Sequence, residues 1–155
     1  MDSTMNKEDL YHDYMLIRNM RAPTSKRTRM LGELLSLCPD HWPVIGITED
    51  ALRVFAEHNY KKVSRMGINR SHLVDRHKTY TTMIDEPLMK CEDWWEFYRK
   101  NDTTILATSS ENMTNSFSKI YDIDTSLGLF QSRGFAWKHN KEEISFLKEQ
   151  QIQLQ

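Results

Sequence analysis

At residues 103–111 a run of β-branched residues leads directly into a helix-capping sequence, which leaves this segment few ways to fold. Residues 103–108 read TTILAT, and such side chains favour a short strand because they pack well on a pleated surface. Residues 108–111 read TSSE, which fits the capping box, where a Thr and a Glu satisfy free amides at a helix start. The sequence therefore predicts a strand that passes without a loop into a helix over 109–118.

Further helices are predicted where apolar residues recur at helical spacing, in most cases behind a capping residue. They cover residues 7–20 after Asn6, 26–37, 49–60 after Thr48, 90–100, and a last segment after Asn140 that carries Ile144 and Leu147. In the second helix, Met30, Leu34 and Leu37 are predicted to face inward. The aromatic stripe over 90–100 is interpreted as core rather than as a surface for stacking bases.

Two more extended segments are predicted from alternation and turn residues. Residues 68–74, INRSHLV, alternate as a half-buried strand would. Residues 127–131 and 135–138 flank Ser132-Arg133-Gly134, which favours a hairpin with Gly at the turn.

These elements predict an α+β fold, a mostly helical single domain built around a small β-β-α element. A length of 155 residues with 39% hydrophobic and 28% charged residues is ordinary for one globular domain. We expect N-terminal helices over 7–60, a ββα core over about 64–118 with a helical insertion at 76–100, and a C-terminal hairpin and helix over 120–151.

The sequence also excludes several classes of protein. No apolar run approaches the roughly 20 residues of a membrane helix, and the polar N-terminus is unlike a signal peptide. Cys38 and Cys91 stand alone without CxxC spacing, so no structural zinc is expected. They are interpreted as free thiols in a reducing, cytoplasmic compartment.

The formal net charge is −1, yet the basic residues are concentrated in two stretches, over 16–30 and over 61–78. Such patches suit contact with the phosphates of nucleic acid. The residues predicted to bind nucleic acid are Lys26, Arg27, Arg29, Lys61, Lys62, Arg65, Arg76 and Lys78. The alternative is a solvated surface whose counter-charges lie nearby in the fold.

A possible centre for chemistry lies between the strand over 68–74 and the helix over 109–118. Hydrolysis of a phosphodiester needs a base to activate water and a divalent cation to stabilise the phosphate. His72 is a candidate base because imidazole titrates near neutral pH. Asn112 offers a hard oxygen to Mg²⁺ or Mn²⁺. Arg70 and Arg76 would hold the phosphate backbone.

The same two segments resemble a known family. Residues 103–115, TTILATSSENMTN, look like the second strand and helix of HNH homing endonucleases from phages and mobile introns. Residues 69–74, NRSHLV, resemble their first strand and the Asp-Arg-Gly-His signature of the nonspecific ββα-metal (His-Me finger) nucleases. The resemblance implies that His72 is the general base, that Asn112 binds the metal, and that Arg70 matches the arginine two residues before the histidine.

The resemblance implies a Mg²⁺-dependent (or Mn²⁺-dependent) endonuclease of phage or mobile-element type that acts on nucleic acid, with double-stranded DNA as the expected substrate. A homodimer would place two such sites on one duplex. The chain departs from the family pattern at Ser71, where HNH enzymes often have a metal-binding Asp or His, and at Thr103, where the middle asparagine belongs. Acids left open as further metal ligands are Asp75, Asp102, Asp122 and Asp124.

Two other functions are compatible with the sequence. One is a nucleic-acid-binding module without catalysis, in which His72 is a structural histidine. The other is a protein-interaction regulator of phage or plasmid origin. Dependence on divalent metal separates the endonuclease from both. Salt-sensitive retention on nucleic acid separates the binding module from the protein-interaction regulator.

Overall fold

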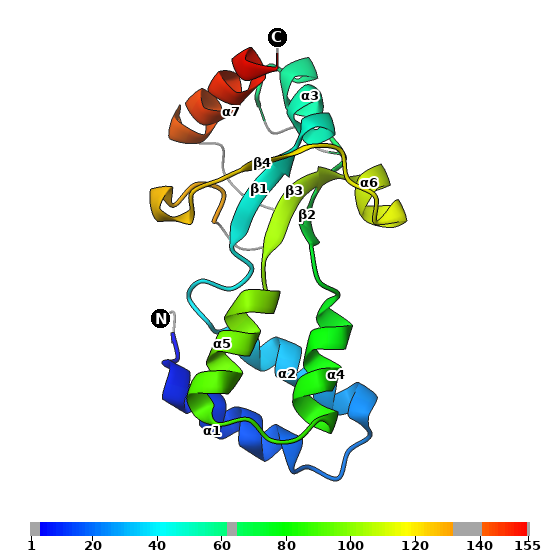
Figure 1. Cartoon of the computed structure of the whole chain (residues 1–155), viewed down its shortest axis with the longest axis vertical. Coiled ribbons are helices and arrows are strands. Elements are labelled where there is room, and N and C mark those ends of the chain that lie inside the picture. Colours follow the sequence, from blue (N-terminus) through cyan, green and yellow to red (C-terminus); the bar gives the residue numbers. More distant parts are fainter. Residues whose placement is uncertain (1–3, 62–64, 132–140, 155) are drawn as a thin grey trace. The chain divides into compact units, whose positions relative to one another are not determined.

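The computed structural model describes residues 4–61, 65–131 and 141–154, and the chain divides into two compact units (Figure 1). The first, here called the helical unit, comprises Met1–His41 and Val74–Thr103. The second, the sheet unit, comprises Trp42–Leu73 and Thr104–Gln155. Helices occur together with one four-stranded sheet, so the predicted α+β class is confirmed. The single domain stays a prediction.

Four helices build the helical unit: α1 (Lys7–Arg18), α2 (Thr24–Leu35), α4 (Arg76–Asp85) and α5 (Cys91–Asn101). Each packs against two others, because α1 contacts α2 and α5, and α4 also contacts α2 and α5. Asn6 caps α1 as predicted, its side chain accepting a hydrogen bond from the Asp9 amide. The predicted insertion over 76–100 thus contains two helices. The sequence predicted only the second of them, α5.

Aromatic side chains form the centre of the helical unit, which confirms that the stripe on α5 is core. Trp94 and Tyr98 are fully buried, and the Trp94 ring stacks on Tyr14 of α1 with ring centroids 4.9 Å apart. The Tyr14 hydroxyl donates a 2.6 Å hydrogen bond to the carbonyl of Met83, at the end of α4. Three helices therefore meet at Tyr14.

The predicted face of α2 is wrong in part. Leu34 is buried, but Met30 and Leu37 are exposed, and Leu31 and Leu35 point inward instead. The helix also begins two residues earlier than predicted, at Thr24, directly after Pro23. Pro is well suited to the start of a helix because it fixes φ and its missing amide costs no helical hydrogen bond there.

The sheet unit contains four strands in the order β2-β3-β1-β4, with bounds β1 Val44–Thr48, β2 Ile68–His72, β3 Thr104–Thr108 and β4 Ile120–Asp122. β1 and β3 are parallel, whereas β2 pairs with β3 and β4 pairs with β1 in the antiparallel sense. The two strands of the predicted β-β-α element thus belong to a larger sheet, which also contains β1 and β4. β1 escaped prediction because most of its residues are buried, so polar alternation is absent.

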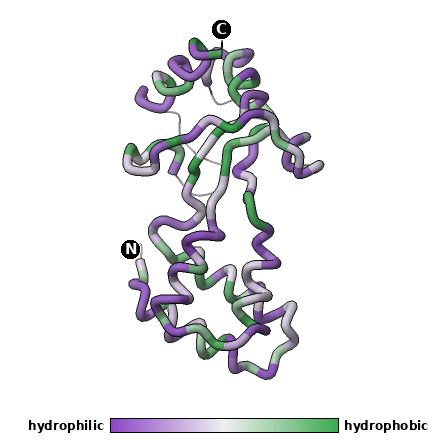
Figure 2. The backbone as a smooth tube through the Cα atoms, viewed as in Figure 1, coloured by the Kyte–Doolittle hydropathy of each residue, from purple (hydrophilic) through white to green (hydrophobic). Residues whose placement is uncertain are grey.

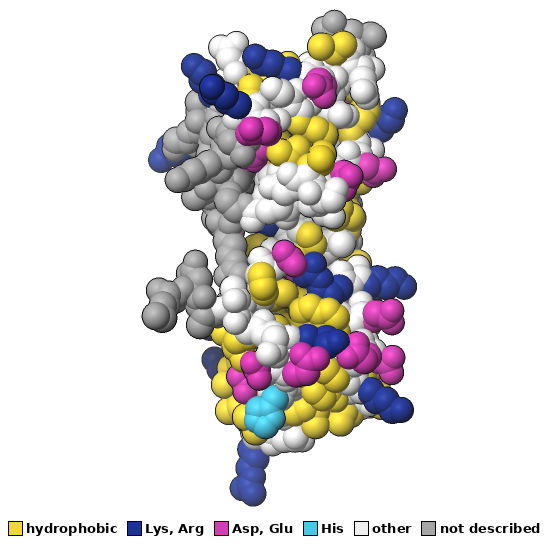
Figure 3. Space-filling model, turned by 90° about the vertical axis from the view of Figure 1, so that its left-hand side faces the viewer, with side chains coloured by type: hydrophobic (Ala, Val, Ile, Leu, Met, Phe, Trp, Pro, Cys, Tyr) yellow, Lys and Arg dark blue, Asp and Glu magenta, His cyan; other side chains and the backbone are white. Residues whose placement is uncertain are grey.

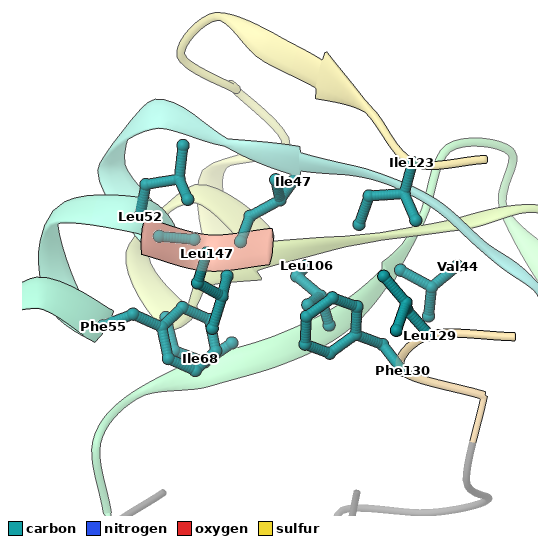
Figure 4. Packing of buried hydrophobic residues seen from close by; sticks show 11 residues of the cluster. Val44, Ile47, Leu52, Phe55, Ile68, Leu106, Ile123, Leu129, Phe130 and Leu147 are labelled. Carbon is teal, nitrogen blue, oxygen red and sulfur yellow. The ribbon is translucent and has the colours of Figure 1, made fainter. Parts of the chain in front are cut away.

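Two helices of the sheet unit, α3 (Glu49–Glu57) and α7 (Lys141–Gln153), pack side by side and contribute Leu52, Phe55 and Leu147 to its core (Figure 4). These side chains meet Val44, Ile47 and Leu106 of the central strands. Thr48 caps α3 as predicted.

A short helix, α6 (Ser109–Thr114), follows β3 directly. The predicted capping box is confirmed, with Thr108 and Glu111 in reciprocal contact. The helix ends sooner than residue 118 because Asn115 adopts the left-handed conformation, with φ 49°. Asn tolerates this conformation better than most residues and commonly ends helices.

The predicted hairpin is not formed over its first arm, 127–131, where Leu127 ends a 3-10 helix, Thr125–Leu127, and residues 128–131 form no strand. Its turn at 132–134, its second arm at 135–138 and the capping residue Asn140 lie outside the described residues. Helices across the molecule carry both hydrophilic and hydrophobic stretches (Figure 2). Within the described ranges, no helix combines the length and apolar character needed to cross a membrane.

Candidate functional site

The pairing of β2 with β3 decides whether the predicted catalytic residues meet. Ile68 pairs with Thr108 at one end of this antiparallel ladder, and His72 pairs with Thr104 at the other. Because α6 follows Thr108, it begins beside the start of β2, where the Ser109 amide donates to the Gly67 carbonyl at 2.8 Å. Four residue steps of about 3.3 Å separate the two ends, or about 13 Å. The structure therefore does not bring His72 and Asn112 together.

His72 lies against an aromatic ring at the far end of β2. It is half-buried, and its imidazole meets the Trp42 indole edge to face, with centroids 4.8 Å apart. The Arg70 guanidinium, on the same strand face, donates to the carbonyl of Trp42. These contacts hold the chain where it enters β1. The roles of His72 and Arg70 in catalysis stay predictions.

Trp42 itself has a left-handed backbone, with φ 56°, which is unfavourable for a bulky residue. Its carbonyl accepts from Thr104 Oγ1 at 3.3 Å as well as from Arg70. The Thr104 hydroxyl also lies 3.0 Å from the Pro43 carbonyl. This short segment is thus fixed by contacts from both β2 and β3.

Asn112 is exposed on α6, and Asn69 rather than His72 reaches the first turn of that helix. The Asn69 amide nitrogen donates to Ser109 Oγ at 3.4 Å. Asn112 follows Ser109 by three residues and so shares roughly its side of the helix. The sequence pattern found the strand and the helix correctly but matched Asn112 to the wrong end of the strand.

The acids considered as further metal ligands have other surroundings. Asp75 caps α4 and Asp124 caps the 3-10 helix, where hydrogen bonds from Ser126 lower the pKa of Asp124. Asp122 is exposed on β4. Across the described ranges, no group of three or more His, Cys, Asp or Glu side chains is placed to hold a metal. Binding of Mg²⁺ or Mn²⁺ stays a prediction, because Asn112 is not of these residue types.

Asp102 belongs to a buried polar cluster in the helical unit that sequence reasoning missed. His41 Nδ1 lies 3.1 Å from the Tyr98 hydroxyl and 3.9 Å from Asp102 Oδ2. Burial, and then the charge of Asp102, raise the pKa of Tyr98 far above its ordinary value, so the phenol stays neutral. The four-residue spacing of Tyr98 and Asp102 indicates that they lie on the same side of a helix. Nothing in the sequence placed His41 beside them.

Ser71 occupies the position where the resemblance expects a metal ligand. It alternates with Arg70 and His72 along β2 and therefore lies on the opposite face of the sheet from them. The residue is 1% exposed, and its hydroxyl has no hydrogen-bond partner among the described residues. Ser71 is thus not placed to share a ligand with His72.

The Glu111 carboxylate is the most extensively hydrogen-bonded side chain near the ends of β1 and β3. It accepts from Thr48 Oγ1 at 2.6 Å and from the Ser118 amide and hydroxyl at 2.7 and 2.9 Å. It also accepts from the Thr108 amide at 3.0 Å and hydroxyl at 3.2 Å. Burial raises the pKa of Glu111, but these hydrogen bonds outweigh burial and leave the pKa below its ordinary value.

The residues predicted to bind nucleic acid are distributed over both units. Lys26, Arg29, Arg76 and Lys78 are exposed in the helical unit, and Lys61 and Arg65 are exposed in the sheet unit. Lys62 lies outside the described residues. Arg27 is engaged within the fold, since its guanidinium donates to the carbonyls of Arg18 and Ala22, both at 2.8 Å. It stabilises the end of α1.

Exposed charges in the helical unit are segregated between two pairs of helices. On the packed pair α2 and α4 the exposed charged residues are Lys26, Arg29, Glu33, Arg76, Lys78 and Asp85. On the packed pair α1 and α5 they are Glu8, Asp9, Glu92, Asp93, Glu96 and Lys100. Figure 3 shows acidic side chains gathered around hydrophobic ones on the helical unit. The pair α2–α4 is therefore basic and the pair α1–α5 acidic.

Comparison with family models, with curated proteins and with solved structures found no significant match to this chain.

Replacing Glu111 by Gln is expected to destabilise the protein by roughly 2–4 kcal/mol, because it removes a charged acceptor from several buried donors. The folded pKa of Glu111 is lowered, so its contribution is fully present above the ordinary pKa of 4.5 and is lost as pH falls through the folded value. Urea unfolding at pH 7 and at acidic pH measures both effects.

The exposed Glu57, at the end of α3, offers a matched control in the same unit. Glu57→Gln should change the free energy of unfolding by less than about 0.5 kcal/mol at either pH. Equal stability of the two variants at pH 7 would show that Glu111 does not have the structural role assigned to it.

Proposed function

We propose that this chain binds nucleic acid through the basic edge of the helical unit, defined as Lys26 and Arg29 of α2 with Arg76 and Lys78 of α4. The charges at the helix starts carry this proposal. A helix start has a partial positive charge and normally has acids in its first turn. Those acids are present in α1, α3, α5, α6 and α7. They are absent from the first turns of α2 and α4, although Asp75 caps α4.

The first turns of α2 and α4 instead contain basic residues. Lys26 and Arg27 lie in the first turn of α2, and Arg76, His77 and Lys78 open α4. Each cation at such a position disfavours the helix by roughly 0.3–1 kcal/mol at low salt. Local rules of this kind are broken mostly at functional sites. Asp75 at the start of α4 and Asp85 beside Thr24 offset part of this charge. An anionic partner removes the rest, and the phosphate backbone of nucleic acid is such a partner.

α2 and α4, the two helices with basic first turns, are also neighbours. Thr24 Oγ1 lies 3.3 Å from Asp85 Oδ1, so the start of α2 meets the end of α4. In the last third of α2, an added Cβ at Gly32 would lie 3.2 Å from the Tyr80 ring, in the middle of α4. The helices are therefore antiparallel, and their basic starts lie at opposite ends of one packed pair.

Endonuclease activity is a second proposal, which the order of β2, β3 and α6 supports. Two antiparallel strands precede a helix, as expected for a ββα element, and the helical insertion lies between the strands. The separation of His72 from Asn112 argues against one metal shared by these two residues. If phosphodiesters are cleaved, at most one of His72 and Asn112 acts at the scissile phosphate, because the base and the metal must both reach it.

Charge reversal tests the binding proposal. The double variant Lys26→Glu/Arg29→Glu is expected to bind a labelled nucleic acid at least about tenfold more weakly than the wild type. Each phosphate contact favours binding by releasing counterions from the nucleic acid, and the variant loses two such contacts. Fluorescence anisotropy at two salt concentrations measures the affinity and its salt dependence. Far-ultraviolet circular dichroism confirms folding.

Lys100 supplies the matched control, since it is exposed in the same unit but lies on the acidic pair. Lys100→Glu makes half the change in charge of the double variant and should leave binding within about twofold of the wild type, the scale of nonspecific electrostatics. An equal loss in both variants would mean that overall charge, and not the basic edge, determines binding.

Cleavage of plasmid DNA and of a structured RNA tests the second proposal, with Mg²⁺, Mn²⁺ or EDTA and with His72→Ala and Asn112→Ala. An endonuclease should cut only with metal, and loss of whichever of His72 and Asn112 acts at the phosphate should slow cutting by about 100-fold or more. A lack of cutting of every substrate by a folded, binding-competent protein would contradict it and leave the binding proposal intact.

A further inference from the structure

The side chains around the basic edge indicate which form of nucleic acid it fits, an inference that rests on the proposed function. α2 has the sequence TSKRTRMLGELL and α4 has RHKTYTTMID. Outward-facing residues near the basic positions include hydroxyl-bearing and basic ones, such as Ser25 and His77, which hydrogen-bond or pair with phosphate oxygens. Two acids also lie there: Asp75 caps α4, and Asp85 lies beside Thr24 at the start of α2.

The edge has no exposed Phe, Tyr or Trp ring on which unpaired bases could stack. Proteins that hold single strands stack bases on exposed aromatic rings. The described residues of α2 include no aromatic side chain, and Tyr80, on α4, is 7% exposed and packs beside Gly32. Half-exposed aromatic residues of the helical unit, Trp95 and Phe97, lie instead on α5 in the acidic pair, where a phosphate backbone would be repelled.

The edge also lacks most groups that read base sequence. Asn and Gln side chains, which recognise adenine in the major groove, do not occur in the described residues of α2 or α4. Arg29 and Arg76 can contact either guanine or phosphate. Because no amide side chain of α2 or α4 stands beside them to read a base, contacts restricted to the backbone are expected.

The spacing of the two basic ends suits a stiff partner. Helices of 12 and 10 residues are about 18 and 15 Å long at 1.5 Å per residue. That span corresponds to roughly four to five base-pair steps of 3.4 Å. A duplex presents phosphates at fixed separations because it is stiff over about 150 base pairs. A single strand must be ordered before it can contact both ends.

We infer that the basic edge binds double-stranded nucleic acid through its phosphate backbone alone, without reading its sequence. The two ends of the α2–α4 pair contact phosphates separated along the duplex. DNA and RNA duplexes share this backbone chemistry. The binding experiment with both kinds of duplex distinguishes DNA from RNA.

The test measures binding of the full chain to a labelled 20-base-pair DNA duplex, a duplex of shuffled sequence, the matching RNA duplex and one separated strand. Both DNA duplexes should bind within about twofold of each other, and the single strand about tenfold more weakly. With up to four phosphate contacts, the slope of log affinity against log salt should be no steeper than about −3.6. Binding of one or both kinds of duplex supports the inference.

Different failures have different meanings. Single-strand binding as tight as duplex binding, or strong preference for one DNA sequence, overturns the inference while the proposed function stands. Duplex binding that persists unchanged in Lys78→Glu and in Lys26→Glu/Arg29→Glu places the contact elsewhere and overturns both. Lack of binding to all four probes overturns the proposed function itself. Lys100→Glu is the control for overall charge.

Discussion

The sheet unit depends on the buried carboxylate of Glu111. Burying a carboxylate is unfavourable unless hydrogen bonds replace its lost water. Here the donors come from the ends of both parallel strands, through Thr48 and Thr108, and from Ser118, which precedes β4. One side chain thereby fixes the ends of β1 and β3 and the path of the chain into β4. The starts of α3 and α6 lie at the same edge, since each helix is capped by the Thr that ends its strand.

Part of this arrangement could be predicted because it is local. The capping box at Thr108 and Glu111, the cap at Thr48 and the stripe on α5 all depend on residues within one or two helical turns. The contacts of Glu111 with Thr48 and Ser118 could not be predicted. They require the parallel pairing of β1 with β3, which joins segments almost 60 residues apart and leaves no local pattern. β1 and α4 were missed for related reasons: β1 is buried on both faces, and α4 has few apolar residues.

The candidate site illustrates the same limit. Sequence reasoning placed a strand carrying His72 next to a helix carrying Asn112, and both elements exist. Their register was the missing information: in an antiparallel pair, the helix that follows β3 lies beside the start of β2, whereas His72 ends β2. Basic stretches visible in the sequence map in part to α2 and α4, and the structure shows that these helices are neighbours that lack acids in their first turns.

Nuclear magnetic resonance would locate the contact surface without any substitution. Backbone amide shifts of ¹⁵N-labelled protein are recorded during titration with a 20-base-pair duplex. Our account predicts that shifts concentrate on α2 and α4, around Lys26, Arg29 and Lys78, and spare α6 and the end of β2. Shifts centred on His72 or Asn112, with α2 and α4 unchanged, would contradict it and return the strand–helix element to the centre of function.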